Sequence, residues 1–184
     1  MSALKFYKSG PSISLPDIEL LEKIVNHSLP EDFKQFYLTH NGGIPDRDWW
    51  DSDDNYDPVR VKRFKIIART NEAYSNDTKY LDALYTTMTK KVVPETLLPF
   101  AIDDGGNFFC LDLTENNICL YAIDSFDNNI SPESNHANAY RWLTGSFENF
   151  INNLKHESEI YIQLKISPLN IYQENVNITT RSLL

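Results

Sequence analysis

The residues best suited to chemistry or recognition lie in an acidic, aromatic segment, residues 46–57 (DRDWWDSDDNYD). This segment contains six Asp and one Arg, which give it a local charge of −5. Large aromatic side chains anchor many protein interfaces, and a negative field attracts a basic partner. The pattern therefore predicts a partner-binding site made of Asp46, Asp48, Trp49, Trp50, Asp51, Asp53, Asp54, Tyr56 and Asp57.

A second interpretation of the same segment is internal to the chain. The tryptophans would then fold back over the core, and nearby basic residues would neutralise the aspartates. Residues 58–91 carry eight basic and three acidic residues, a local charge of +5. The sequence leaves both interpretations open. The basic residues available on the following strand are Arg60, Lys62, Arg63, Lys65 and Arg69.

The other nucleophiles and bases form no recognisable catalytic motif. His40 falls in the last turn of a predicted helix, which favours a place at the core edge or beside the helix dipole. Asp103 and Asp104 precede two glycines, which is typical of a turn and not of paired catalytic carboxylates. We therefore predict that the protein is not an enzyme.

No metal or cofactor is expected. Aligned with an EF-hand loop, the acidic segment places Tyr56 where glycine is needed and Lys62 where glutamate is needed. The histidines and cysteines lack the spacing of a zinc site. Cys110 and Cys119 lie outside any CxxC unit, which favours two reduced thiols, with a cross-strand disulfide as the alternative.

Composition narrows the range of partners. A chain of 184 residues, 41% of them hydrophobic, is the size of one folded domain. Its net charge of −9 disfavours nucleic acid and anionic membranes, so we expect neither as a partner. Residues 1–10 lack the apolar core of a secretory signal, and no apolar run is long enough to span a membrane. These features predict a cytoplasmic protein.

Periodicity predicts an α+β domain, with one mainly antiparallel sheet and helices packed against it. The domain is expected to cover residues 1–156, with residues 157–184 as a C-terminal extension packed on it as a strand or a helix. Residues 125–138 are polar and are expected to form a loop. The predicted helices are 16–26, 30–40, 78–88 and one beginning at Ser146; the predicted strands are 59–68, 97–102, 107–113 and 118–123.

Three blocks of sequence resemble the SUKH superfamily. The first is Leu29-Pro30-Glu31-Asp32-Phe33 followed by Phe36-Tyr37 and Asn41-Gly42-Gly43. The second is Leu98-Pro99-Phe100-Ala101 with Asp103 and Gly105-Gly106-Asn107 before Phe108-Phe109-Cys110-Leu111-Asp112. The third is Ser146-Phe147-Glu148-Asn149-Phe150 with Leu154. The resemblance covers about residues 15–43, 97–124 and 145–155. Residues 44–96 match only in outline, and the acidic segment has no counterpart.

The resemblance implies a SUKH-like α+β fold and a binding protein without catalytic residues. Bacterial members are mostly immunity proteins that bind and neutralise a cognate toxin, often a nuclease. We therefore expect an immunity protein whose partner is a basic toxin. The alternative is a regulatory interaction scaffold that resembles the fungal cell-wall regulators of the same superfamily. The sequence leaves the oligomeric state open.

Overall fold

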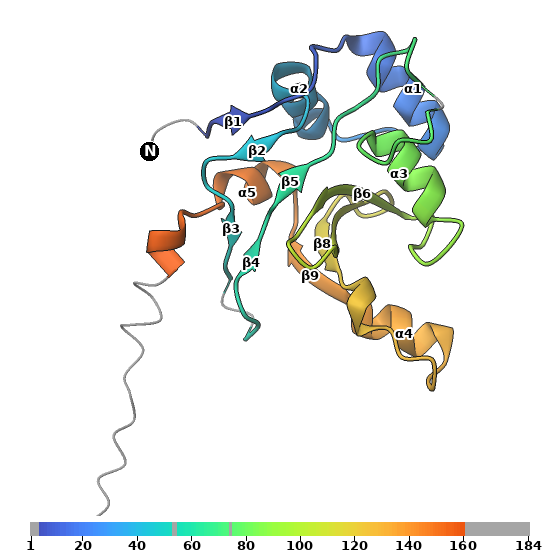
Figure 1. The fold of residues 1–184 in the computed structure, drawn as a ribbon, viewed down its shortest axis with the longest axis vertical. Coiled ribbons are helices and arrows are strands. Elements are labelled where there is room, and N and C mark those ends of the chain that lie inside the picture. Colours follow the sequence, from blue (N-terminus) through green and yellow to red (C-terminus); the bar gives the residue numbers. More distant parts are fainter. Residues whose placement is uncertain (1–3, 53–54, 74, 161–184) are drawn as a thin grey trace, which may run out of the picture.

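In a computed structural model of the chain, the centre of the fold is a five-stranded antiparallel sheet. Figure 1 shows the helices and the short strands arranged around it. The structure describes residues 4–52, 55–73 and 75–160. The strand order follows the sequence, so each strand pairs with its neighbour along the chain. These strands are β5 (Arg63–Phe64), β6 (Leu97–Ile102), β7 (Phe108–Asp112), β8 (Ile118–Tyr121) and β9 (Tyr140–Thr144).

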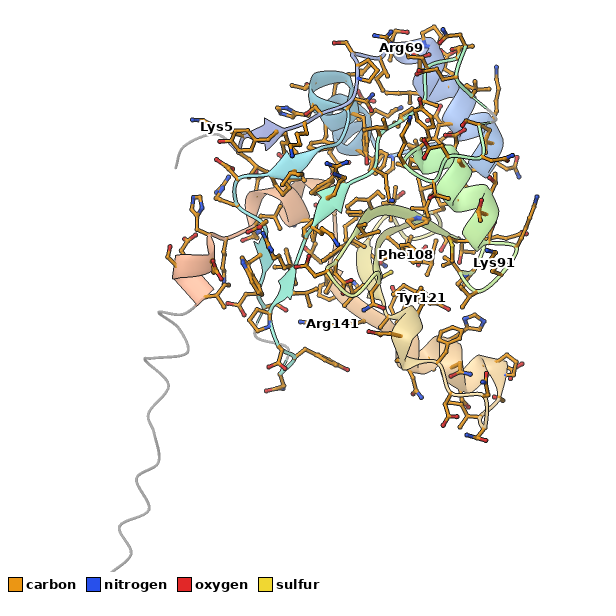
Figure 2. All side chains as sticks on the ribbon, in the orientation of Figure 1. Lys5, Arg69, Lys91, Phe108, Tyr121 and Arg141 are labelled. Carbon is orange, nitrogen blue, oxygen red and sulfur yellow. The ribbon has the colours of Figure 1, made fainter. Side chains whose placement is uncertain are left out.

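Both faces of this sheet bury apolar side chains. On one face a large cluster, the first core, gathers residues of the sheet and of the helices around Phe64, Phe100 and Phe109. On the other face a smaller cluster, the second core, contains Phe108 and Tyr121, which are labelled in Figure 2. The helices are α1 (Leu15–Val25), α2 (Glu31–His40), α3 (Leu81–Met88), α4 (Pro132–Ala139) and α5 (Phe147–Asn152), with a short 3-10 helix η1 (Ile123–Ser125).

Helices α1, α2 and α5 contribute to the first core, whereas α4 contributes to the second. Helix α3 contributes to both: Leu81 belongs to the first core and Leu84 to the second. The predicted α+β architecture, with an antiparallel sheet covered by helices, is confirmed. Within the described residues, no helix is long and apolar enough to cross a membrane.

Two short strand pairs extend the structure beyond the central sheet. Strand β1 (Phe6–Tyr7) pairs with β2 (Ile44–Pro45), and β3 (Trp49–Trp50) pairs with β4 (Val59–Arg60). An isolated bridge between Gly43 and Phe64 connects β2 to β5. Gly43 has φ +110°, and a Cβ atom there would lie 2.7 Å from the Tyr7 carbonyl oxygen, so only glycine fits this close approach.

The end of α2 explains how the chain turns from the helical layer into the strands. Asn41 takes the left-handed C-cap conformation, with φ 41° and ψ 59°. Its side chain is buried, where Nδ2 donates to the carbonyl oxygen of Pro11 at 2.7 Å and Oδ1 accepts from the N–H of Ile67 at 2.8 Å. Asn41 therefore ends the helix and also joins three separate segments.

Three expectations about secondary structure need correction. The segment 125–138 is not a loop, because it contains the end of η1 and most of α4. Strand β9 was not predicted at all. The single strand expected over residues 59–68 is divided into β4 and β5, which belong to different sheets.

The C-terminal extension is described only as far as residue 160, where Ile160 is buried. Whether residues 161–184 form a strand or a helix lies outside the described residues. The division at residue 156 therefore stays a prediction.

Candidate partner-binding site

The described residues of the acidic segment include β3 and part of the connection from β3 to β4. In the β3–β4 hairpin, Trp49 is the register partner of Arg60, and Trp50 is the partner of Val59. Asp53 and Asp54, two of the predicted site residues, lie outside the described residues. The other predicted residues are close in the chain, but their side chains have different surroundings.

Trp50 is a core residue and not a surface anchor. It is 4% exposed, and its indole stacks on the Phe150 ring of α5 with a centroid separation of 5.2 Å and an interplanar angle of 26°. Successive residues of a strand point to opposite sides, so the half-buried Trp49 faces away from this contact. Trp50 therefore folds back over the core, as the second interpretation of the acidic segment predicted.

Three of the aspartates are engaged within the chain. Asp48 Oδ2 accepts a hydrogen bond from Arg60 Nε at 2.7 Å, and this bond raises the pKa of Arg60. Asp51 Oδ2 lies 2.8 Å from Lys155 Nζ. Asp46 Oδ1 accepts from the backbone N–H of Lys5 at 3.0 Å. The local charge of −5 is therefore partly compensated at the hairpin itself.

Backbone pairing also fixes the hairpin to the end of the domain. The N–H of Trp49 donates to the carbonyl oxygen of Lys155 at 3.1 Å, and the N–H of Lys155 donates back to Trp49 at 2.8 Å. Together with the Asp51–Lys155 ion pair, this two-way bridge holds β3 beside the segment that follows α5.

Tyr56 and Asp57, in the connection from β3 to β4, are exposed and contact Arg141 of β9. Tyr56 is 62% exposed, and the guanidinium carbon of Arg141 lies 4.6 Å from its ring centroid. Arg141, labelled in Figure 2, also donates from Nη1 to the carbonyl oxygen of the exposed Asp57 at 3.2 Å. The next residue of β9, Trp142, is 55% exposed and is the register partner of Cys119 of the second core, so it lies on the face of β9 opposite Arg141. We call Tyr56, Asp57, Arg141 and Trp142 the aromatic tip.

Sequence reasoning missed Arg141 and Trp142 because it placed no strand over residues 140–144. A signal was nevertheless present. Leu143 is buried, and strand alternation around it places Arg141 on the inner side and Trp142 on the outer side. A large aromatic on the outer side of an edge strand is a candidate contact residue.

The residues considered for catalysis have structural roles. Asp103 accepts hydrogen bonds from the backbone N–H of Asn107 at 2.8 Å and from its Nδ2 at 3.0 Å, which closes the turn between β6 and β7. Asp104 instead contacts Arg60 at 3.4 Å. His40 packs against the rings of Phe6 and Phe36, and burial lowers its pKa.

The two thiols and the metal-ligand types form no reactive centre either. Cys110 and Cys119 are register partners on β7 and β8, fully buried in the second core and not linked to each other. Burial raises the pKa of Cys110 well above its usual range, which keeps it protonated and unreactive. Among the described residues, no group of three or more His, Cys, Asp and Glu is placed to hold a metal ion.

The fold and the tip define an α+β domain with a candidate contact surface. The family model for the SMI1 / KNR4 family (SUKH-1) matches residues 12–153, and the chain belongs to this family. The matched range includes residues 44–96, which the motifs covered only in outline. The resemblance to the SUKH superfamily is thereby confirmed, and so is the SUKH-like fold class. A comparison with curated proteins finds no match.

Family membership gives a coarse functional assignment. The family is associated with immunity proteins and with SMI1/KNR4 regulators, and its members are generally non-enzymatic. It implies protein partners, of which toxins are one kind.

Proposed function

We propose that this protein is a cytoplasmic immunity protein that binds and neutralises a cognate polymorphic toxin by direct contact. The observation that carries the proposal is the aromatic tip, where two large aromatic side chains, Tyr56 between β3 and β4 and Trp142 on β9, are more than half exposed. Tyrosine and tryptophan are the residue types most enriched among interface hot spots. Contact with Arg141 holds Tyr56 in place before any partner arrives, which reduces the entropy lost on binding.

Charge supports a basic partner. The net charge of −9 attracts a positively charged surface at long range, and such steering raises association rates by about 10- to 1,000-fold. A nuclease toxin is basic around its phosphate-binding cleft, so it fits this field. Because Asp48 and Asp51 are paired with cations of the chain, the local negative field of the described segment comes mainly from Asp46, whose partner is an uncharged backbone N–H, and from the exposed Asp57.

From the predicted site, the proposed docking surface keeps Trp49, Tyr56 and Asp57 and adds Trp142. Asp46, Asp48 and Asp51 support the hairpin beneath it. Trp50 holds the hairpin on α5 through its stack with Phe150.

The test uses the full chain and the polypeptide encoded by the neighbouring reading frame. Tyr56→Ala and Trp142→Ala should each weaken binding by about tenfold or more, as hot-spot truncations do. Leu15→Ala is the matched control, since Leu15 is an exposed apolar residue (57%) at the start of α1. Cells that co-express the toxin polypeptide should survive with the control and lose protection with the double tip variant.

Charge is tested separately by association kinetics. Asp57→Asn should slow association and reduce its dependence on salt, because it removes one charge from the docking surface. Glu115→Gln is the control, as Glu115 is exposed in the turn between β7 and β8. Unchanged binding and protection in the Tyr56→Ala/Trp142→Ala double variant would show that the toxin docks elsewhere.

The family also contains regulators, so the same experiment must separate the two roles. A regulatory scaffold would bind cellular proteins through the tip but would give no protection against the neighbouring polypeptide. Protection of cells by this chain, lost on truncation of the tip, is expected only of an immunity protein.

A further inference from the structure

A cavity of about 660 Å³ lies where β1, β2 and β5 meet, away from the aromatic tip. Its lining is strongly basic for a chain with a net charge of −9. Five of the 17 Lys and Arg residues line it, and no acidic residue of the described chain does. The basic lining residues are Lys8, Lys62, Arg63, Lys65 and Lys79.

The cavity borders β5 and the end of β6, from which Arg63, Phe64 and Ile102 line it. Arg63 is the register partner of Ile102, and Ile102 packs at the edge of the second core. The side chains of Arg63 and Ile102 therefore lie on the face opposite the first core. Ile44 and Ile66 also line the cavity, so it combines apolar walls with cationic groups.

Among the residues that the structure describes, most of this positive charge has no acidic partner. Lys79 pairs with Asp77 at 3.0 Å, and Lys62 approaches Asp104 at 3.9 Å, with the side chains of both pairs about half exposed. Within the part of the chain that the structure describes, the other three, Lys8, Arg63 and Lys65, make no ion pair.

Among the five basic residues, Lys65 gives the strongest argument for a bound anion because its side chain is half-buried. Burial is the largest effect on the pKa of Lys65 and lowers it, and the positive charge of Arg63 lowers it further. The negative charge of Asp77 raises this pKa by a smaller amount. A buried cation beside a like charge is destabilised, and a bound anion would relieve both effects. On β5, the contact with the first core is made by Phe64.

We propose that this cavity binds a small phosphate-bearing anion of nucleotide size. The phosphates would lie among Lys8, Arg63 and Lys65, and the apolar part of the ligand would lie against Ile44, Ile66 and Ile102. The volume falls within the usual range for small-molecule sites, about 300–1,000 Å³. Phosphate groups concentrate several negative charges in a small space, whereas an acidic side chain carries only one, so phosphates match a cluster of cations better. In addition, the guanidinium fork of arginine matches the geometry of phosphate oxygens.

The experiment is calorimetric titration of the full chain with ATP, tripolyphosphate and adenosine at low ionic strength. ATP should bind, and adenosine alone should not. Lys65→Met should weaken ATP binding by about tenfold or more, because one charge-assisted hydrogen bond is lost. Arg63→Gln should also weaken ATP binding. Because Arg63 is exposed, this variant should stay folded and can test the proposal even if Lys65→Met unfolds the protein. Lys23→Met, at an exposed lysine of α1 outside the cavity, is the control and should bind ATP normally.

The two anions distinguish what the site recognises. Binding of ATP and tripolyphosphate with similar affinity supports a site for phosphate alone, and tighter binding of ATP supports use of the apolar wall. If neither anion binds, or if Arg63→Gln and Lys65→Met bind as tightly as the unmodified chain, the proposal is wrong. Binding of a hexaglutamate peptide without any binding of ATP would also overturn it, because the cavity would then be a site for an acidic protein segment. These outcomes do not depend on the proposed immunity function.

Discussion

Replacing Trp50 by alanine tests whether the acidic segment is anchored in the core or offered to a partner. Trp50 is 4% exposed and stacks on Phe150 of α5. The substitution removes most of a large buried side chain and leaves a cavity in the first core. Truncations of this kind destabilise proteins by about 3–5 kcal/mol. Total stabilities of domains are about 5–15 kcal/mol, so the loss should be a large fraction of the whole.

The assay is urea unfolding followed by far-ultraviolet circular dichroism, which does not depend on tryptophan fluorescence. Trp50→Phe should destabilise less than Trp50→Ala, because a ring remains to stack on Phe150. A double-mutant cycle with Phe150→Leu should show a coupling of about 0.5–1.5 kcal/mol, typical of an aromatic pair. Tyr56→Ala is the matched control, since it truncates an exposed aromatic of the same segment and should lose about 1 kcal/mol or less.

The reasoning would be refuted by a small effect at Trp50. A loss below about 1 kcal/mol for Trp50→Ala, equal to that of Tyr56→Ala, would place the indole outside the core. The partner-anchor interpretation of Trp50 would then return.

Two further predictions concern buried polar side chains. Burial alone would raise the pKa of Asp17, but hydrogen bonds from the N–H and hydroxyl groups of Ser14 and Thr70 lower it from 3.8 to about 2. Because the folded-state pKa is lowered, this stabilisation of about 2 kcal/mol is present above pH ~4 and is lost as the pH falls towards ~2. In Asp17→Asn, the free energy of unfolding measured with urea should therefore fall less between pH 5 and pH 2 than in the unmodified chain. The same slope of unfolding free energy against pH in both proteins would contradict this role of Asp17. Asn41→Gly keeps the backbone conformation but leaves the buried N–H of Ile67 without its partner, so it should lose about 1–3 kcal/mol in thermal or urea unfolding. Asn41→Ala should lose about 1–2 kcal/mol more because alanine must take a positive φ, and equal stability of the two variants would disprove this account.

The parts of the fold that were predictable carry local signals. Helix α2 follows Pro30 and ends at Asn41, and β6, β7 and β8 are apolar runs separated by turn residues. Helix α4 (PESNHANA) has no apolar stripe, so periodicity does not reveal it. Its local signals are Ser131, whose side chain accepts from the N–H of Ser134, and Pro132 and Glu133 in the first turn.

The candidate site was less predictable because its decisive partners are distant in sequence. Lys155, which pairs with Asp51, is 104 positions away, and only the completed sheet brings α5 beneath Trp50. The pairing of Asp48 with Arg60 spans only 12 positions, and the sequence did identify basic residues on the next strand as neutralising partners. Local pattern therefore indicated the charge balance of the hairpin, but it did not decide which aromatic residue is buried.

The aromatic tip and the basic cavity lie at opposite ends of the central sheet, which leads to a prediction about their independence. The tip rests on β9, the last strand in the order, whereas the cavity opens beside β5, the first. Substitutions at well-separated sites with no shared partner act additively. Tyr56→Ala should therefore leave ATP titration of the cavity unchanged, and Arg63→Gln should leave protection against the neighbouring toxin polypeptide unchanged. If Arg63→Gln abolished protection while the protein stayed folded, the toxin would bind through the basic face, and an acidic partner surface would have to replace the basic one inferred from the net charge.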